Sequence, residues 1–199
     1  FGFLGFAPFF DPDRAFHIYG KDDKMTPEEI INYIQNPTFW PVSMDMLNAK
    51  IDMHTFPNDE LIISDDIKIK FTLHGHPNGA NSYRIEIGGS VIVYSTDCEH
   101  PTTHLNHHVI ENAQDADILI HDAQYTDEEL PAHKGWGHSS WQQAVEVAKT
   151  ANVKQLILYH HDPARNDDEM YKLETDAQGE FPNTLAARQG MEIHIPASY

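Results

Sequence analysis

Three short apolar segments of this chain each stop at a histidine or an aspartate. Residues 91–96 run into Asp97, residues 117–120 into His121 and Asp122, and residues 156–159 into His160 and His161. Segments of β-branched residues and leucine bounded by polar residues are typical of buried strands. Because α/β enzymes build their sites at the ends of strands, we expect one sheet edge to collect these side chains. Imidazole and carboxylate groups bind divalent metals, so the pattern indicates a metal site in an α/β fold.

The bulk composition predicts one globular domain over residues 1–199. The chain has 40% hydrophobic and 11% aromatic residues, which is enough for a core. No internal repeat is evident, no apolar run approaches the length of a membrane span, and no signal peptide is recognisable. The single Cys98 excludes an internal disulfide and fits a reducing compartment. We therefore expect a cytoplasmic protein with no membrane partner.

The formal net charge of −18 argues against strong nucleic-acid binding, because affinity for phosphates comes mainly from Lys and Arg. The negative net charge does not exclude a metal enzyme that acts on a phosphoester, because bound cations make the electrostatic potential at their site positive. The chain also carries 14 histidines. We expect seven of them to lie outside any metal site, namely His17, His54, His104, His107, His108, His133 and His194.

The first third of the chain contains few regular elements. Residues 16–20 resemble a short strand. Thr26, Pro27 and Glu29 form a helix start, with Thr26 as N-cap, and this helix should end before Pro37. Residues 35–66 are expected to be irregular.

From residue 67 onward the pattern becomes regular. Residues 82–87 and 90–95 flank Gly88-Gly89, which predicts a two-residue hairpin. Ser139 is the expected N-cap of a helix, with Gln142 at the capping-box position. The remaining expected elements are strands over 67–71, 117–120, 153–159 and 191–195, and helices near 104–113 and after Asn166.

His76, Asp97 and His160 each follow a strand-like segment and are spaced 21 and 63 residues apart. This spacing is far too wide for a zinc finger, so a shared site would have to be assembled by the fold. Strand alternation sends the side chains of His160 and His161 to opposite faces, so only one of them should reach such a site.

Five segments resemble, in order, the motifs of the metallo-β-lactamase-fold hydrolases, in the branch of ribonuclease Z and phosphodiesterase-like enzymes. The segments are 76–85 (HPNGANSYRI), 94–97 (YSTD), 120–125 (IHDAQY), 135–140 (GWGHSS) and 156–160 (LILYH). Each motif is weak alone, but the set is specific and covers about residues 67–165. The resemblance implies an αββα sandwich, in which two β-sheets lie between helices.

The resemblance also implies a dinuclear metal site. His76 would bind one ion, His160 would bind the other, and Asp97 would bridge the two ions. The alignment of the motifs favours His160 over His161 as the ligand. The expected cofactors are two divalent metal ions, zinc first, with manganese or iron as alternatives.

Catalysis is implied for His138, which would stabilise developing charge or protonate the leaving oxygen after attack by a metal-activated hydroxide. His121 and Asp122 would orient the ligands. Simpler structural roles remain open: His138 could merely precede a helix, and His121 and Asp122 could be a buried pair. Trp136 and Trp141 could line the pocket or pack in the core.

One departure from the family pattern concerns its first motif, His-x-His-x-Asp-His, which supplies most of the metal ligands. No such string occurs in the chain. The first strands of the fold are therefore expected to be missing, and the 199-residue chain alone is expected to bind metal weakly and to be nearly inactive.

The favoured function is phosphodiester hydrolysis, with a small phosphodiester or a nucleotide as substrate, and a homodimer is compatible with the resemblance. Two alternatives remain. One is hydrolysis of an ester, thioester or lactam on the same fold. The other is a non-catalytic remnant of the fold that acts in regulation or assembly.

Overall fold

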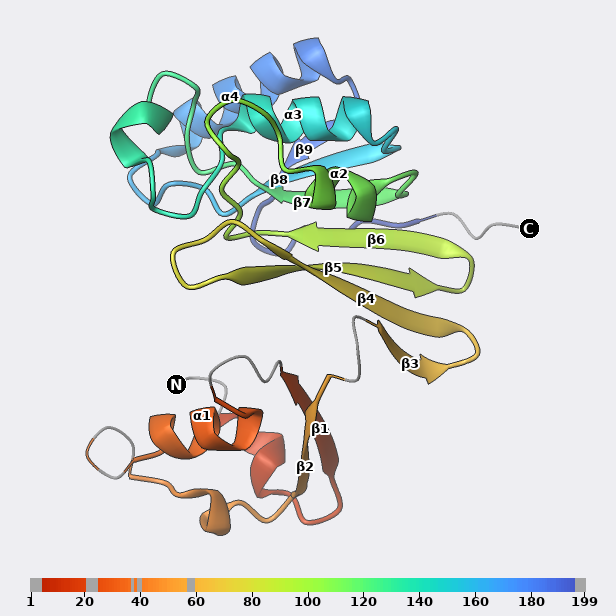
Figure 1. Cartoon of the computed structure of the whole chain (residues 1–199), viewed down its shortest axis with the longest axis vertical. Coiled ribbons are helices and arrows are strands. Elements are labelled where there is room, and N and C mark those ends of the chain that lie inside the picture. Colours follow the sequence, from red (N-terminus) through yellow and green to blue (C-terminus); the bar gives the residue numbers. More distant parts are fainter. Residues whose placement is uncertain (1–4, 21–24, 37, 39–40, 57–59, 196–199) are drawn as a thin grey trace. The chain divides into compact units, whose positions relative to one another are not determined.

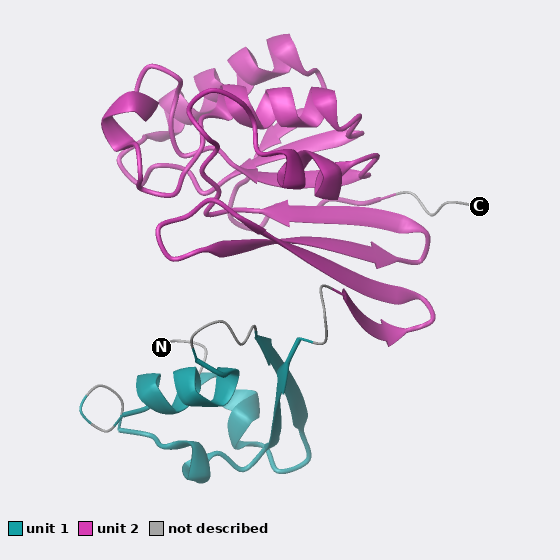
Figure 2. Cartoon of the chain, in the orientation of Figure 1, with its two compact units in different colours: residues 1–58 teal, residues 59–199 magenta. Residues whose placement is uncertain are grey.

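The structure is a computed structural model that describes residues 5–20, 25–36, 38, 41–56 and 60–195 (Figure 1). It divides into two compact units, residues 1–58 and residues 59–199 (Figure 2). This division describes which residues fold compactly together and does not test the family domain. The single family domain over residues 1–199 therefore stays a prediction. Among the described residues, the model has no helix that is both long and apolar enough for a membrane span.

The first unit contains a two-stranded parallel sheet and one α-helix. Strand β1 (Ala15–Gly20) pairs with β2 (Lys50–Thr55). Helix α1 (Pro27–Ile34) begins with the predicted capping box: the Thr26 hydroxyl accepts from the Glu29 amide at 3.2 Å, and the Glu29 carboxylate accepts from the Thr26 amide at 2.8 Å. In the described residues of this unit, two 3-10 helices, Ala7–Phe10 and Met44–Met46, accompany these elements.

The second unit is built on a seven-stranded sheet in the order β3-β4-β5-β6-β7-β8-β9. The strands are β3 (Glu60–Ser64), β4 (Ile67–His74), β5 (Ala80–Ile87), β6 (Ser90–Ser95), β7 (Ile118–Asp122), β8 (Gln155–Tyr159) and β9 (Thr184–Ala186). Pairing is antiparallel from β3 to β6 and parallel from β6 to β9. The predicted hairpin is confirmed, since Ile87 pairs with Ser90 across Gly88 and Gly89, which both have positive φ.

In the part of the second unit that the structure describes, three α-helices and one 3-10 helix accompany this sheet (Figure 1). They are α2 (His107–Ala113), the 3-10 helix Leu130–His133, α3 (Trp141–Thr150) and α4 (Asp167–Glu180). Helix α2 packs on β4, β5 and β6, helix α3 on β7 and β8, and helix α4 on α3 and β9. Val93, Leu119, Leu156 and Leu158 of the sheet are fully buried in one core with residues of these helices. This core fixes the ends of β6, β7 and β8.

Three expectations about elements were wrong. Residues 35–66 are not all irregular, because β2 and β3 lie there and gain their hydrogen bonds from β1 and β4. Residues 191–195 form no strand; the short β9 instead takes the place beside β8. The N-cap of α3 is Ser140, with Gln143 closing the capping box, one residue later than predicted. Ser139 is engaged elsewhere: its amide donates to Asp122 at 2.9 Å.

Candidate functional site

The carboxyl ends of three parallel strands meet at one edge of the sheet in the second unit. Ser95 of β6 pairs with His121 of β7, and Asp122 of β7 pairs with Tyr159 of β8. The residues that follow these strands therefore emerge side by side. Strand β4 runs in the same direction as β6, because β5 pairs antiparallel with both. The predicted segments with His76, Asp97 and His160 thus reach the same edge.

Asp97 lies between the two predicted histidine ligands. Its Oδ1 is 3.9 Å from His76 Nε2 and 3.7 Å from His160 Nε2. These distances are too long for hydrogen bonds, but nitrogen and oxygen donors that share a metal ion are separated by about this much. Asp97 and His160 both have left-handed backbones, with φ of 52° and 58°. Such conformations cost energy in residues other than glycine and are concentrated at functional sites.

Asp97 thus forms a carboxylate–imidazole donor pair with each of the two histidines, and such donors bind divalent metals. Of the two neighbouring histidines, His160 has a ring nitrogen 3.7 Å from the Asp97 carboxylate. His161 is directed to a different environment: both of its ring nitrogens are buried without a hydrogen-bond partner, and burial lowers its pKa.

Asp122 is fully buried and organises the groups around it. Its carboxylate accepts hydrogen bonds from His138 Nδ1 at 2.9 Å, the Ser139 amide at 2.9 Å and the Asp97 amide at 3.1 Å. Its Oδ2 also lies 3.5 Å from His160 Nδ1. One buried carboxylate thus touches the backbone of one predicted ligand and the ring of another, which fits the orienting role predicted for it.

His138 stands beside the predicted ligands. Its ring stacks on His160, with centroids 4.7 Å apart. The hydrogen bond to Asp122 raises the pKa of His138, and burial opposes this only in part. Asp97, His138 and His160 each offer one ligand atom within 4.8 Å of the others. The geometry thus places His138 next to two of the predicted ligands.

His121 lies on the buried side of this edge. It is fully buried, its Nδ1 donates to the Asp122 carbonyl at 2.7 Å, and its ring stacks on His100 at 5.4 Å. Together with Cys98, these histidines form a second group whose ligand atoms lie within 4.8 Å of one another. His100 Nδ1 accepts from the Asn106 amide at 3.0 Å, so its Nε2 carries the proton of the neutral ring. Burial raises the pKa of the Cys98 thiol. Because neither nitrogen of the neutral His100 ring has a free lone pair, the group suits a polar core cluster rather than a metal site.

Glu99 is a site residue that the sequence did not reveal. Its two carboxylate oxygens accept from the amides of Gly135 and Gly137, each at 2.8 Å, and its backbone forms a bridge to Gly75. Glu99 thereby joins the segment that precedes His76 to the Gly-Trp-Gly-His segment. Its position two residues after Asp97 was the available signal.

Gly137 is required by the packing at the site. Its φ is +92°, and a Cβ there would lie 2.1 Å from His76 Cδ2. The backbone of the Gly-Trp-Gly segment thus lies directly against the ring of a predicted ligand.

Two cavities adjoin the predicted ligands. One of about 370 Å³ includes His76, Glu99 and Gly135 in its lining. Another of about 480 Å³ includes His160 and Arg188. Both provide space for a substrate beside the metal-ligand candidates.

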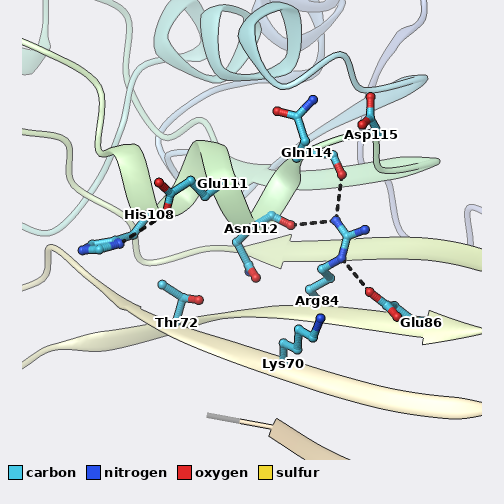
Figure 3. A pocket seen from close by; sticks show the side chains of 9 residues that line it. All are labelled: Lys70, Thr72, Arg84, Glu86, His108, Glu111, Asn112, Gln114 and Asp115. Atoms are coloured by element: carbon cyan, nitrogen blue, oxygen red, sulfur yellow. Dashed lines mark hydrogen bonds and ion pairs between the residues drawn. The ribbon is translucent and has the colours of Figure 1, made fainter.

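A further cavity of about 480 Å³ lies between α2 and the strands β4 and β5 (Figure 3). Arg84 crosses it and donates to the carbonyls of Asn112 at 3.0 Å and Gln114 at 2.8 Å, at the end of α2. The same guanidinium pairs with Glu86 at 2.9 Å. These groups hold α2 against the sheet, and none of the predicted site residues lines this cavity.

Comparisons with known proteins agree with the predicted fold. Residues 28–161 match the family model described as "Beta-lactamase superfamily domain". Ribonuclease Z of Gemmatimonas aurantiaca is 45% identical over 83 residues, which are 42% of this chain and 26% of that protein. Ribonuclease Z of Bacillus subtilis is 33% identical over 108 residues, which are 54% of this chain and 34% of that protein. The aligned regions thus cover about a quarter to a third of these curated relatives.

Solved structures extend the likeness over most of the chain. The metallo-beta-lactamase fold protein YhfI from Bacillus subtilis superposes with a TM-score of 0.66 at 21% identity, covering 89% of this chain and 64% of that one. Human tRNase Z, short form, superposes with a TM-score of 0.65 at 17% identity, covering 92% of this chain and 68% of that one. At these identities the likeness concerns the fold, and it confirms the predicted α/β class.

Proposed function

Because the chain belongs to the beta-lactamase superfamily, we propose that it is a metal-dependent hydrolase that cleaves phosphodiesters. One observation carries the proposal: the Asp97 carboxylate lies within 4 Å of both His76 and His160, beside the hydrogen-bonded pair of Asp122 and His138. A ligand cluster and an adjacent titratable pair are the two parts that metal-assisted hydrolysis requires.

His76, Asp97 and His160 would hold the metal, with Asp97 bridging two ions. Imidazole and carboxylate donors suit zinc, manganese or iron. Bound there, the ions would supply Lewis-acid polarisation of a phosphoryl oxygen and activation of water. The left-handed backbones of Asp97 and His160 are consistent with side chains held for this purpose.

His138 would act on the leaving group. The buried Asp122 accepts the Nδ1 proton of His138, which fixes the tautomer and stabilises the imidazolium. The raised pKa of His138 keeps a larger share of the ring protonated near neutral pH. A protonated imidazole can donate to the oxygen that departs when the phosphoester bond breaks.

The substrate class follows from two observations. The relatives matched by the chain are named ribonuclease Z, and ribonucleases cleave phosphodiesters. The net charge of −18 opposes extended contact with nucleic-acid phosphates, so a small phosphodiester or a nucleotide is the preferred substrate. A homodimer is a further expectation of this proposal.

The test compares three chromogenic substrates: bis(p-nitrophenyl) phosphate, p-nitrophenyl acetate and an acyl thioester. They are assayed with protein expressed from its whole reading frame and with the 199-residue chain. We expect the protein from the whole reading frame to hydrolyse the phosphodiester, with activity that a chelator abolishes and that zinc or manganese restores. The 199-residue chain alone is expected to be nearly inactive. His104→Ala, at an exposed histidine outside the site, serves as the control and should match the wild type.

Two results would count against the proposal. Faster turnover of the ester or thioester would favour the alternative hydrolase class. Absence of both turnover and metal uptake in the whole protein would favour a non-catalytic module.

A further inference from the structure

Trp136 is exposed although the backbone around it is firmly held. The side chain is 60% exposed, whereas Trp141, the first residue of α3, is partly buried against the core. Tryptophan is mostly buried in folded proteins because its ring carries a large apolar area. An exposed tryptophan in a fixed position is therefore a candidate contact for a bound ligand.

Glu99 holds the backbone on both sides of Trp136. One carboxylate oxygen accepts from the Gly135 amide and the other from the Gly137 amide, each at 2.8 Å. The Trp136 amide itself donates to the His133 carbonyl at 3.1 Å. Charge-assisted bonds of this kind are stronger than neutral ones, so the loop is rigid at the point where the indole projects.

The loop that carries Trp136 lies at the candidate active site. Gly137 packs against the His76 ring, and Gly135 lines the cavity that also includes His76. Trp136 stands between these two glycines. The backbone that carries Trp136 is thus held beside the ring of a predicted ligand, and the exposed indole contacts the His133 ring.

A continuous row of rings connects Trp136 to His138. Trp136 contacts the His133 ring edge-on, with centroids 4.9 Å apart. His133 stacks on Tyr125 at 4.1 Å, and Tyr125 meets His138 edge-on at 6.1 Å. Tyr125 is only 3% exposed, which anchors the row in the core.

We propose that Trp136 is a stacking platform for the nucleobase of the substrate. The proposal rests on the phosphodiesterase function proposed above and names a nucleotide diester as its substrate class, whose cleavage releases a nucleoside monophosphate that carries the same base. Every nucleobase has a π-face that stacks on an exposed aromatic ring. In an acidic chain with 31 Asp and Glu against 13 Lys and Arg, stacking offers affinity that surface cations do not.

The test is a comparison of two ligands that differ only in the base. Binding of adenosine 5′-monophosphate and of ribose 5-phosphate is measured by calorimetry for the wild type, Trp136→Ala and Trp136→Phe. We expect the wild type to bind the nucleotide more tightly, and Trp136→Ala to weaken nucleotide binding by about 5- to 100-fold without changing binding of ribose 5-phosphate. Trp136→Phe should retain most of the nucleotide affinity.

Tyr33→Ala, at another exposed aromatic residue, is the control and should bind both ligands like the wild type. Thermal unfolding of each variant shows whether the fold is kept. Equal weakening for both ligands, no change in either, or a wild type that fails to prefer the nucleotide would overturn the platform.

The outcomes also separate this inference from the proposed function. A hydrolase whose Trp136→Ala variant keeps the nucleotide preference refutes the platform alone. A protein that distinguishes the two ligands through Trp136 but cleaves no phosphodiester keeps the platform and refutes the hydrolase.

Discussion

The Asp122 carboxylate accepts the Nδ1 proton of His138 at 2.9 Å, and Asp122 is fully buried while the His138 side chain is 13% exposed. The buried partner and the titrating partner thus differ in their access to water. Asp122 stabilises the charged form of the ring, and of the two side chains it is His138 that is accessible from outside.

Replacing Asp122 by asparagine should lower the pKa of His138, because the hydrogen bond to Asp122 is the largest cause that raises it. A general acid works when protonated, so activity is present below this pKa and is lost as pH rises through it. In Asp122→Asn the alkaline limb of the kcat profile should therefore move to lower pH.

His138→Ala should lower turnover by about 10²–10⁴-fold with metal content retained. Loss of metal in His138→Ala would instead make His138 a ligand.

His160 should be required for metal binding. The chain would offer Asp97 and His160 to one ion and Asp97 and His76 to the other, fewer than the three or four ligands usual for zinc. Zinc titration calorimetry of the 199-residue chain should therefore show weak binding that His160→Ala weakens further and His104→Ala leaves intact. Tight stoichiometric zinc that survives dialysis would contradict the expected weakness, and unchanged binding in His160→Ala would contradict the ligand assignment.

Alanine at two glycines of one loop should have different effects. Gly135 and Gly137 both have left-handed backbones, with φ of +85° and +92°, so either substitution costs about 1–2 kcal/mol of stability. A Cβ at Gly137 would meet His76 at 2.1 Å, whereas a Cβ at Gly135 has nothing within 4 Å. Gly137→Ala should therefore weaken metal binding by at least about tenfold, equivalent to 1.4 kcal/mol, and Gly135→Ala should not. Equal metal affinities in the two variants would show that the packing of Gly137 against the His76 ring does not affect metal binding by His76.

Local signals in the sequence predicted the elements that local chemistry determines. The Thr26 capping box, the hairpin at Gly88-Gly89 and the strands that end before Asp97 and His160 all follow from neighbouring residues, whereas β7 continues through His121 and Asp122, two residues beyond its predicted end. Strands β2 and β9 were missed because their hydrogen bonds come from partners distant in sequence. Strand β3 was missed although its partner β4 is the next strand along the chain.

The candidate site shows the same division. Its residue types could be read from the ends of strands, but the contact of Asp122 with the Asp97 amide spans 25 residues. The bonds from Glu99 to the Gly-Trp-Gly segment span 36 and 38 residues. The choice of Ser140 over Ser139 as N-cap likewise depends on Asp122, which takes the Ser139 amide. Such contacts between residues distant in sequence can be identified only in the folded structure.

Acid should destabilise the second unit through its buried histidines. Burial lowers the pKa of His100 from 6.5 to about 3, and burial also lowers the pKa of His121. Below pH 6.5 the unfolded chain binds protons that the folded chain rejects, so the free energy of unfolding falls as pH drops from about 6.5 toward 3. His100 alone should contribute a slope of up to about 1.4 kcal/mol per pH unit in this window.

Urea unfolding between pH 4.5 and 7.5 measures this slope. His100→Asn keeps an acceptor for the Asn106 amide but has no titrating ring, so its stability should depend less steeply on pH than that of the wild type. His104→Asn, at an exposed position four residues away, should keep the wild-type slope. If His100→Asn and the wild type lose stability in parallel, the acid sensitivity does not arise from His100, and the buried histidines His74 and His121 become the groups to replace.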